Sequence, residues 1–317
     1  MRISKHIQIV SVAFWAFCHI VFITSCTEAD LNIRIREGTV TIHPHWQGNV
    51  FHPTTYNFFK DNDGELVYHE EWICTDEKLV QSVDEGLYRV LAYNHNADGV
   101  EFFNSKNYEQ IIVQAKTQNS SRSTKTHIAQ PSEVYAIMVE QLDVPDKGSI
   151  LERPGLVPRT KKMKFHFSLS GITGIQKIEG TINGVFPSLI LATGKPTQDA
   201  IKFSPTTVVQ FSTNVTNGNG EANIRIFGIK NPKSTESSYS NKMILQLVDF
   251  NHDYQQVEVD MNQTISDILY KNEGEIPPGK IVNVNILIKP IGENGGLTAT
   301  VHSWHTSIDQ GQGAGTI

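Results

Sequence analysis

Cysteine is scarce in this chain of 317 residues, which holds only Cys18, Cys26 and Cys74. Three cysteines cannot supply a disulfide framework, and these three do not show the paired spacing of a zinc site. The burial of apolar side chains must therefore stabilise the fold. At roughly 100–200 residues per domain, a chain of this length predicts two domains.

The chain also lacks the short motifs of common enzymes. It contains no Gly-x-Ser-x-Gly, no phosphate-binding loop and no dinucleotide-binding fingerprint, and its scattered acidic residues offer no pair for glycoside hydrolysis. Positive charge is in short supply as well, because 27 Lys and Arg stand against 33 Asp and Glu and leave a net charge of −6. Nucleic-acid binding needs basic residues that neutralise phosphates, so we do not expect that activity. Because the enzyme motifs are missing, we also expect neither catalysis nor a cofactor.

Metal-ligand clusters are weakly represented. His43, His45 and His52 form the best candidate, in which residues 43 and 45 could share one face of a strand. Pro44 between them marks a strand edge or end, and no carboxylate or cysteine stands at ligand spacing. We therefore expect exposed imidazoles at a strand terminus and no bound metal.

The N-terminal residues have the form of a secretion signal. Two basic residues precede a mostly apolar run, residues 7–23, which three polar residues interrupt, and small residues lead up to Cys26. A transmembrane helix would need about 20 apolar residues without such interruptions. We therefore expect residues 1–25 to be a signal peptide that is cleaved between Ser25 and Cys26.

The residues around this cleavage point are similar to the lipobox of bacterial lipoproteins. The sequence Ile23-Thr24-Ser25-Cys26 departs from the usual pattern only at Ile23, where Leu is commoner. The resemblance implies that Cys26 is acylated, and at about 0.8 kcal/mol per buried methylene several acyl chains would hold residues 26–30, a lipidated tether, on the membrane. Glu28 and Asp30 resemble a surface-export signal of Bacteroidota lipoproteins, with a plain solvated tether as the alternative. We expect a lipid anchor in the outer membrane, facing the cell exterior.

Short alternating runs separated by Gly, Pro, Asn and Asp dominate the rest of the chain. Leu31, Ile33 and Ile35 alternate with polar residues, as do the apolar residues of 163–169 and 282–288. This period of two is the signature of half-buried strands and predicts an all-β fold. Residues 264–270 are the exception, since their apolar residues have helical spacing and predict a short connecting helix.

A connector is expected between residues 143 and 162, where three prolines and two glycines occur. It divides the chain into an N-terminal β-sandwich domain, residues 31–152, and a C-terminal β-sandwich domain, residues 153–305. The last residues, 306–317, contain three glycines and little alternation, which predicts a flexible tail and a poor donor strand.

In its overall order of motifs the chain resembles the fimbrillin superfamily of Bacteroidales, and within it the FimB-like anchor and minor subunit lipoproteins. The motifs that carry this resemblance are, in chain order, the lipobox, Leu31-Asn32-Ile33, Pro44-His45-Trp46, the run from Glu85 to Asn94, and Val301-His302-Ser303-Trp304. The resemblance implies two tandem transthyretin-like β-sandwich domains, no enzymatic activity, and a role in anchoring or building surface fimbriae used in adhesion.

Members of that superfamily assemble by strand donation, in which a segment of one subunit completes the sheet of its neighbour through main-chain hydrogen bonds. Stalk subunits lose their first strand by proteolysis, whereas an anchor is expected to keep it; here that retained strand would contain Leu31, Ile33 and Ile35. The implied partners are the outer membrane, through lipidated Cys26, and other fimbrial subunits. Arg34, Arg36, Arg153 and Arg159 are candidate cleavage points, and the sequence does not distinguish them.

A second interpretation stays open, in which the chain is a surface lipoprotein that binds a glycan or a host ligand outside any fimbria. It predicts a solvent-exposed aromatic platform, for which Trp46, Trp72 and Trp304 are the candidates. Buried positions in the sandwich cores are the competing placement for each of these tryptophans.

Overall fold

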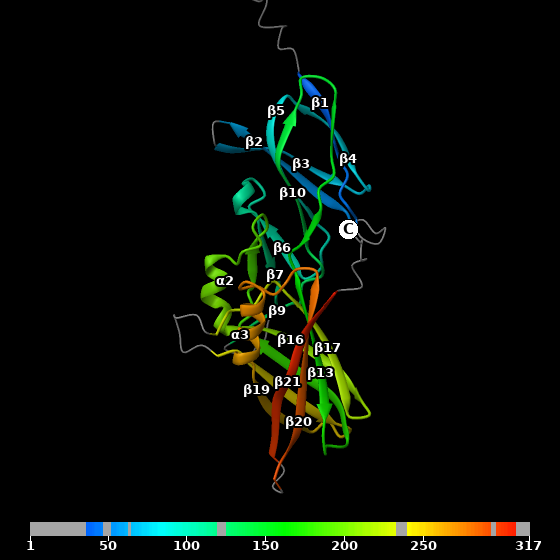
Figure 1. Cartoon of the computed structure of the whole chain (residues 1–317), viewed down its shortest axis with the longest axis vertical. Helices are drawn as coiled ribbons and strands as arrows, with labels where there is room; N and C mark the ends of the chain where they lie inside the picture. The colour runs from blue at the N-terminus through cyan, green and yellow to red at the C-terminus, as the bar shows by residue number, and fades with distance from the viewer. Residues whose placement is uncertain are drawn as a thin grey trace, which may run out of the picture.

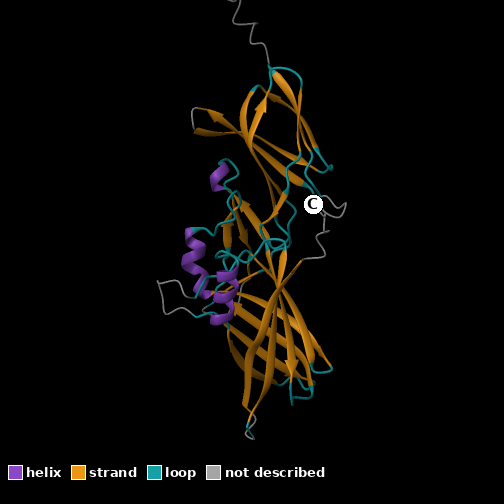
Figure 2. Cartoon of the chain, in the orientation of Figure 1, coloured by secondary structure: helices purple, strands orange, loops and turns teal. Residues whose placement is uncertain are grey.

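The computed structural model describes residues 36–46, 52–62, 65–118, 125–232, 240–292 and 296–308. These residues form an elongated molecule built almost entirely from strands, with a few short helices on one side (Figures 1 and 2). The all-β class expected from the alternating sequence pattern is confirmed. Among the described residues, no helix has the length and apolar character that crossing a membrane requires.

The strands, in chain order, are β1 (Glu37–Ile42), β2 (Thr54–Asn62), β3 (Glu65–Cys74), β4 (Leu79–Asp84), β5 (Gly86–Asn94), β6 (Val100–Phe103), β7 (Ile112–Ala115), β8 (Thr117–Gln118), β9 (Thr126–Ile128), β10 (Tyr135–Val144), β11 (Ser149–Glu152), β12 (Leu156–Pro158), β13 (Lys161–Leu169), β14 (Ile175–Asn183), β15 (Ser188–Ile190), β16 (Thr207–Thr216), β17 (Asn219–Ile226), β18 (Lys242–Asp249), β19 (Tyr254–Asp260), β20 (Lys280–Ile291) and β21 (Gly296–Ile308). The helices are α2 (Gln198–Phe203), α3 (Asn262–Lys271) and the 3-10 turns η2 (Tyr108–Gln110) and η3 (Ser204–Thr206).

At one end of the molecule, a five-stranded sheet in the order β12-β10-β5-β2-β3 packs against a three-stranded sheet in the order β11-β1-β4. Apolar side chains from both sheets form one buried cluster between them, the N-terminal core. It includes Val40 and Ile42 of β1, Phe58 of β2, Val90 of β5 and Leu142 of β10. This arrangement places the first described strand over the core of a β-sandwich.

Strand β5 is buried on both of its faces. Val90 and Ala92 face the N-terminal core, while Leu91 and Tyr93 belong to a second, larger buried cluster that continues into the other half of the molecule. A strand that is covered on both sides needs apolar residues at successive positions, which explains the unbroken run Val90-Leu91-Ala92-Tyr93.

At the other end, one large sheet runs β19-β18-β14-β16-β17-β13-β20-β21, and β9 and β8 attach to it at β16. The sheet folds over so that its two halves, β19 to β16 and β17 to β21, face each other. Met163, Phe165 and Phe167 of β13 point into the core between them, and the ring of Phe211 stacks on Phe165 at 5.6 Å between centroids. The alternation expected for residues 163–169 is therefore confirmed.

Strand pairing crosses the connector that the sequence predicts. In a small sheet ordered β15-β7-β6, strand β15 of the second half pairs with β7 of the first, and β9 pairs in parallel with β16. The two parts of the predicted division, residues 31–152 and 153–305, therefore share a sheet and the larger buried cluster.

The predicted helix is confirmed as α3, which buries Ile265, Ile268 and Leu269. Helix α2 was not expected from the sequence; its available signal is Thr197, whose hydroxyl accepts a hydrogen bond from the backbone N–H of Ala200 at 3.0 Å and caps the first turn.

The end of the chain differs from the expectation of a tail that begins at residue 306. Strand β21 continues through Thr306, Ser307 and Ile308, which pair with Val282, Ile281 and Lys280 of β20. A register shift near the middle of this ladder breaks the alternation that sequence analysis looks for, although the hydrogen bonding continues. Residues 309–317 lie outside the described residues.

Candidate functional site

The residues that the sequence assigns to anchoring lie before the described part of the chain. Ser25 and Cys26, at the predicted cleavage and lipidation site, and Leu31, Ile33 and Ile35, in the predicted first strand, are all outside the described residues. These assignments stay predictions. The first strand that the structure describes is β1, which begins at Glu37, and the candidate site is built around it.

Strand β1 is paired along both of its edges. It is antiparallel to β4 over six residue pairs, from Glu37 opposite Asp84 to Ile42 opposite Leu79. On its other edge it is parallel to β11 over four pairs, from Thr39 opposite Ser149 onward. We call the position between β4 and β11 the β1 slot. Its occupant satisfies the inward-facing backbone groups of both neighbours, which would otherwise be exposed sheet edges.

The side chains of β1 fix the strand in this slot. Val40 and Ile42 are fully buried in the N-terminal core, while Thr39 and Thr41 point away from it. Burying an aliphatic side chain of this size contributes about 1.5–3 kcal/mol. A Cβ on Gly38 would lie 2.7 Å from the carbonyl oxygen of Pro145, so only glycine allows the backbone to approach this closely.

Polar contacts hold both ends of β1. At its start, Arg36 Nη1 donates to Glu85 Oε2 at 3.1 Å, and this hydrogen bond raises the pKa of the guanidinium. Beyond its end, His43 Nε2 lies 3.2 Å from Glu77 Oε1, and Trp46 Nε1 donates to the carbonyl oxygen of Glu77 at 2.6 Å. These contacts hold β1 at both of its ends, in addition to the backbone pairing with β4 and β11 along its edges.

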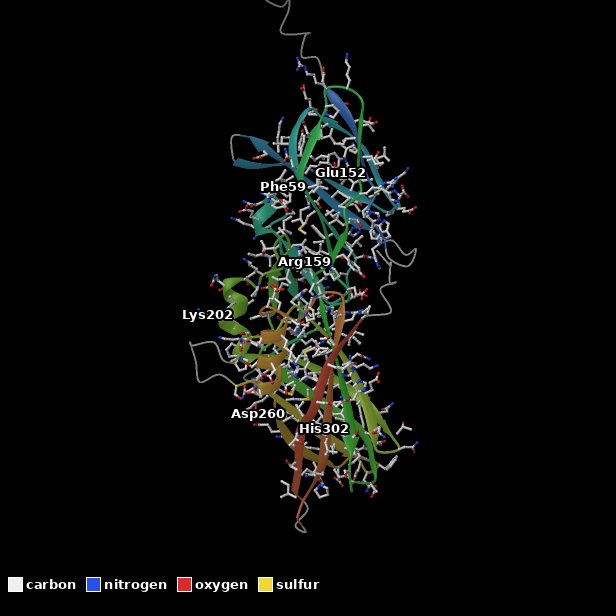
Figure 3. The ribbon with its side chains drawn as sticks, viewed as in Figure 1. Phe59, Glu152, Arg159, Lys202, Asp260 and His302 are labelled. Carbon is white, nitrogen blue, oxygen red and sulfur yellow. The ribbon has the colours of Figure 1, made fainter. Side chains whose placement is uncertain are left out.

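Solvent exposure separates the arginines that the sequence offers as cleavage points. Arg36 has a side chain that is 57% exposed, and Arg153 is also exposed. Arg159 is only 8% exposed, at mid-length of the molecule (Figure 3), where its Nη2 donates to the carbonyl oxygen of Ala192 at 2.5 Å. Burial lowers the pKa of Arg159. A protease could reach Arg36 or Arg153 in the folded protein but not Arg159; Arg34 lies outside the described residues.

The three tryptophans offered as an aromatic platform divide between the two buried clusters, so they do not form one platform. Trp46 and Trp72 are half-buried against the N-terminal core, where Trp72 meets the Phe58 ring edge-on at 4.7 Å between centroids. Trp304 packs against the larger cluster, with the ammonium of Lys271 4.8 Å from its ring centre. Each tryptophan is half-buried against a core, so the competing interpretation, which places them in the cores, is met in part.

The histidine cluster also separates into individual contacts. His43 faces Glu77, while the His52 ring stacks on Tyr135 at 5.6 Å between centroids. Within the ranges that the structure describes, no group of three or more His, Cys, Asp or Glu side chains could hold a metal ion.

Solved structures share this fold at low sequence identity. A candidate adhesin from Bacteroides ovatus matches with a TM-score of 0.55 and 15% identity, over 86% of this chain and 96% of that chain. A candidate polysaccharide-binding protein from Bacteroides thetaiotaomicron matches with a TM-score of 0.53 and 9% identity, over 87% of this chain and 100% of that chain. The fimbrial anchor protein Mfa2 from Porphyromonas gingivalis matches with a TM-score of 0.47 and 12% identity, over 86% and 97% of the two chains.

No protein-family model and no curated protein matches the chain. The all-β fold that the resemblance implies is shared with a candidate adhesin and a candidate polysaccharide-binding protein of Bacteroides species. At these identities the likeness shows the fold alone.

Proposed function

We propose that this chain is a cell-surface lipoprotein that serves as an anchor or accessory subunit of a fimbria used in adhesion, without enzymatic activity. Its anchor is Cys26, acylated after cleavage behind Ser25, in the outer membrane and facing the exterior. The observation that carries the proposal is the β1 slot, in which the first described strand is paired on both edges and buries Val40 and Ile42. The shared fold with a candidate adhesin supports it.

The proposed architecture is two tandem transthyretin-like β-sandwich domains, residues 31–152 and 153–305. The packed pair of sheets at one end of the molecule and the larger folded sheet at the other support two sandwiches (Figure 2). Their strands cross the proposed boundary, because β12 joins the N-terminal sheet and β8 and β9 join the larger sheet.

The proposed mechanism is strand complementation between subunits. If β1 were absent, β4 and β11 would present unpaired backbone groups on either side of exposed apolar side chains, a surface that an extended segment of another subunit could fill. A chain that keeps β1, together with the preceding Leu31, Ile33 and Ile35, offers no such opening. It therefore ends a fibre at the cell surface instead of extending it, with other fimbrial subunits as its partners.

The test replaces the lipidated cysteine. Cys26→Ala should abolish incorporation of labelled fatty acid and release fimbriae from the cells into the medium, because the acyl chains that hold the anchor are missing. Cys74→Ala is the matched control. Cys74 is half-buried against the N-terminal core, and its Sγ donates to the carbonyl oxygens of Asp76 and Lys78. Its loss should change neither readout. Fimbriae of unchanged length and attachment in Cys26→Ala cells would count against the proposal.

One observation favours a second function, the binding of a glycan or host ligand at the cell surface outside any fimbria. A polar groove of about 890 Å³ lies over β14, β16 and β18 of the second half, and Gln118 and Gln130 of the first half also line it. A fold shared with a candidate polysaccharide-binding protein supports the same interpretation.

A further inference from the structure

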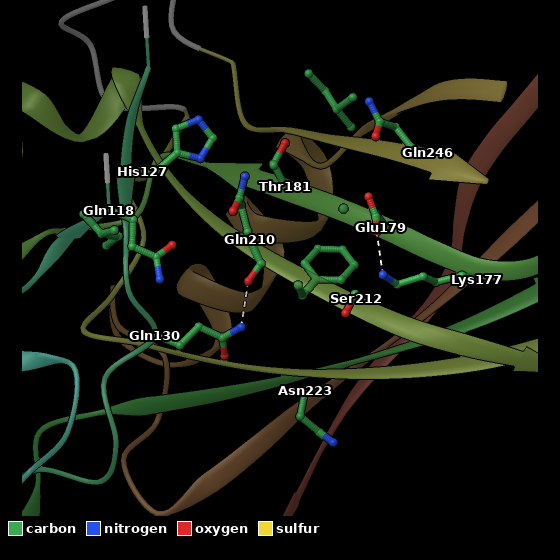
Figure 4. Close-up of a pocket in the computed structure, with 14 residues that line it drawn as sticks. Gln118, His127, Gln130, Lys177, Glu179, Thr181, Gln210, Ser212, Asn223 and Gln246 are labelled. Carbon is green, nitrogen blue, oxygen red and sulfur yellow. Dashed lines mark hydrogen bonds and ion pairs between the residues drawn. The ribbon is translucent and has the colours of Figure 1, made fainter. Parts of the chain in front are cut away.

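The groove lies on the outer face of the sheet formed by β18, β14 and β16, and strands β9 and β8 continue that sheet on one side (Figure 4). Its volume of about 890 Å³ falls within the range of pockets that hold small organic ligands. The inner face of the same strands carries the apolar residues of the larger core, so the groove has a rigid floor.

Register places the outward side chains of three strands in rows across this floor. Thr181 of β14 lies between Gln210 of β16 and Ile244 of β18. In the next row, Glu179 lies between Ser212 and Gln246. The floor therefore presents amide and hydroxyl groups at the spacing of neighbouring strands, about 4.7–4.9 Å, around one aliphatic side chain.

The wall of the groove is held in place by Gln130, which follows β9. Its Nε2 donates to the carbonyl oxygen of Gln210 at 2.7 Å, and its Oε1 accepts from the backbone N–H of Arg225 at 3.1 Å. Figure 4 shows the first of these bonds crossing from the wall to the floor. Because both ends of this side chain are occupied, the wall is ordered before any ligand arrives.

A buried polar group in the same wall has no partner of its own. His127 is 9% exposed, lines the groove beside Gln118, and its Nδ1 makes no hydrogen bond within the described chain. Buried polar groups in native structures are nearly always hydrogen-bonded, and an unsatisfied one calls for an explanation such as a bound water molecule, ion or ligand.

The charge in the groove is internally balanced. Lys177 Nζ lies 2.6 Å from Glu179 Oε1, so this ion pair leaves no net charge for an ionic ligand (Figure 4). The chain as a whole carries a net charge of −6, which disfavours acidic ligands. A neutral ligand with many hydroxyl groups matches the remaining side chains, because amides and hydroxyls both donate and accept hydrogen bonds.

We propose that this groove binds a segment of a neutral oligosaccharide. Thr181, Gln210, Ser212 and Gln246 contact its hydroxyl groups, and Ile244 packs against the C–H face of a sugar ring. This inference names the ligand of the second function proposed above and rests on it. It is independent of the fimbrial role, because it uses neither Cys26 nor the β1 slot.

The test applies the full chain, purified in detergent, to an array of neutral oligosaccharides built from glucose, mannose, galactose and xylose, alongside acidic ones that contain uronic or sialic acid. Neutral hits are then followed by affinity electrophoresis in gels that contain the corresponding polysaccharide. The double variant Thr181→Ala/Gln210→Ala should lose about tenfold or more in affinity, since it removes two direct contacts. The backbone carbonyl of residue 210 that accepts from Gln130 remains in this variant.

The matched control is Gln114→Ala, an exposed glutamine on β7 outside the groove, which should bind as the unchanged protein does. Equal thermal unfolding temperatures for all variants show that they are folded. Absence of binding to every neutral glycan, binding to acidic glycans alone, or equal retardation of the double variant and the unchanged protein would each overturn the inference. None of these outcomes bears on whether Cys26→Ala releases fimbriae.

Discussion

Two buried tyrosines in the N-terminal core differ in whether their hydroxyl groups are satisfied. Tyr88 donates to the carbonyl oxygen of Asp84 at 3.1 Å, whereas the hydroxyl of Tyr56 has no hydrogen-bond partner within the described chain. Burial raises the pKa of Tyr56, consistent with a desolvated phenol. A buried donor without a partner costs about 1–3 kcal/mol, while a satisfied one contributes about 0.5–1.5 kcal/mol.

The two conservative substitutions should therefore have opposite effects. Tyr56→Phe should leave the free energy of unfolding unchanged or raise it, and Tyr88→Phe should lower it by about 0.5–1.5 kcal/mol. Urea denaturation measures both. Destabilisation of Tyr56→Phe by as much as Tyr88→Phe would mean that the Tyr56 hydroxyl is satisfied in solution.

The surroundings of Glu133 make the free energy of unfolding depend on pH. Burial alone would raise its pKa, but hydrogen bonds from Lys162 and from the Tyr135 hydroxyl, the latter at 2.6 Å, together with the nearby charge of Arg225, hold it below the usual value. The folded state thus favours the carboxylate. This contribution to stability is present above the pKa of an unfolded glutamate, about 4.3, and is lost as pH falls through the lower folded value.

Glu133→Gln should accordingly flatten the acid limb of the curve of unfolding free energy against pH, measured between about pH 7 and pH 3. At neutral pH it should cost about 1–3 kcal/mol, because Lys162 and Arg225 lose the negative charge that pairs with them. Glu101→Gln, at an exposed position on β6, is the control and should leave the curve unchanged. An acid limb of equal slope in Glu133→Gln would contradict the assignment.

At the scale of the element, β1 has one face in the core and one in solvent. Ile42→Ala should destabilise the protein by about 2–5 kcal/mol, because Ile42 is fully buried between the two sheets. Thr41→Ala, on the outward face of the same strand, should change stability by no more than about 0.5 kcal/mol. Chemical denaturation checks both values, and comparable losses would show that β1 does not occupy the slot as described.

Sequence patterns predicted those elements whose signal is local. Alternation located β13, and apolar spacing located α3. The partners of each strand could not be predicted, because β1 pairs with residues 79–84 and 149–152, and no local pattern encodes contacts at such separation. The continuation of β21 through Ile308 was missed for a related reason: the ladder with β20 sustains it, not its own alternation.

The two candidate sites differ in what the sequence could reveal. Val40 and Ile42 alternate with threonines, a local pattern typical of a strand with one buried face, but only the fold shows that both edges of this strand are covered. In the groove, Thr181 and Gln210 look like ordinary solvent-facing positions of two strands, and only register makes them neighbours. The tryptophans gave a stronger sequence signal for a ligand platform, yet packing against the cores accounts for them.

At the scale of the whole molecule, the two sites are separated along the long axis. Strand β1 lies at one end, and the sandwich that carries the groove occupies the other (Figure 1). If the residues before β1 lead to an acylated Cys26, the slot lies next to the membrane and the groove is directed away from it. The same orientation suits a fibre end anchored at the cell and a ligand site presented to the surroundings.

The most direct test of the account is mass spectrometry of the N-terminus of the mature protein isolated from cells. The account predicts that the chain begins at Cys26, that this cysteine carries acyl chains, and that Leu31, Ile33, Ile35 and all of β1 remain attached. A free thiol at Cys26, or a chain that begins at Glu37 or later after cleavage behind Arg36, would contradict it.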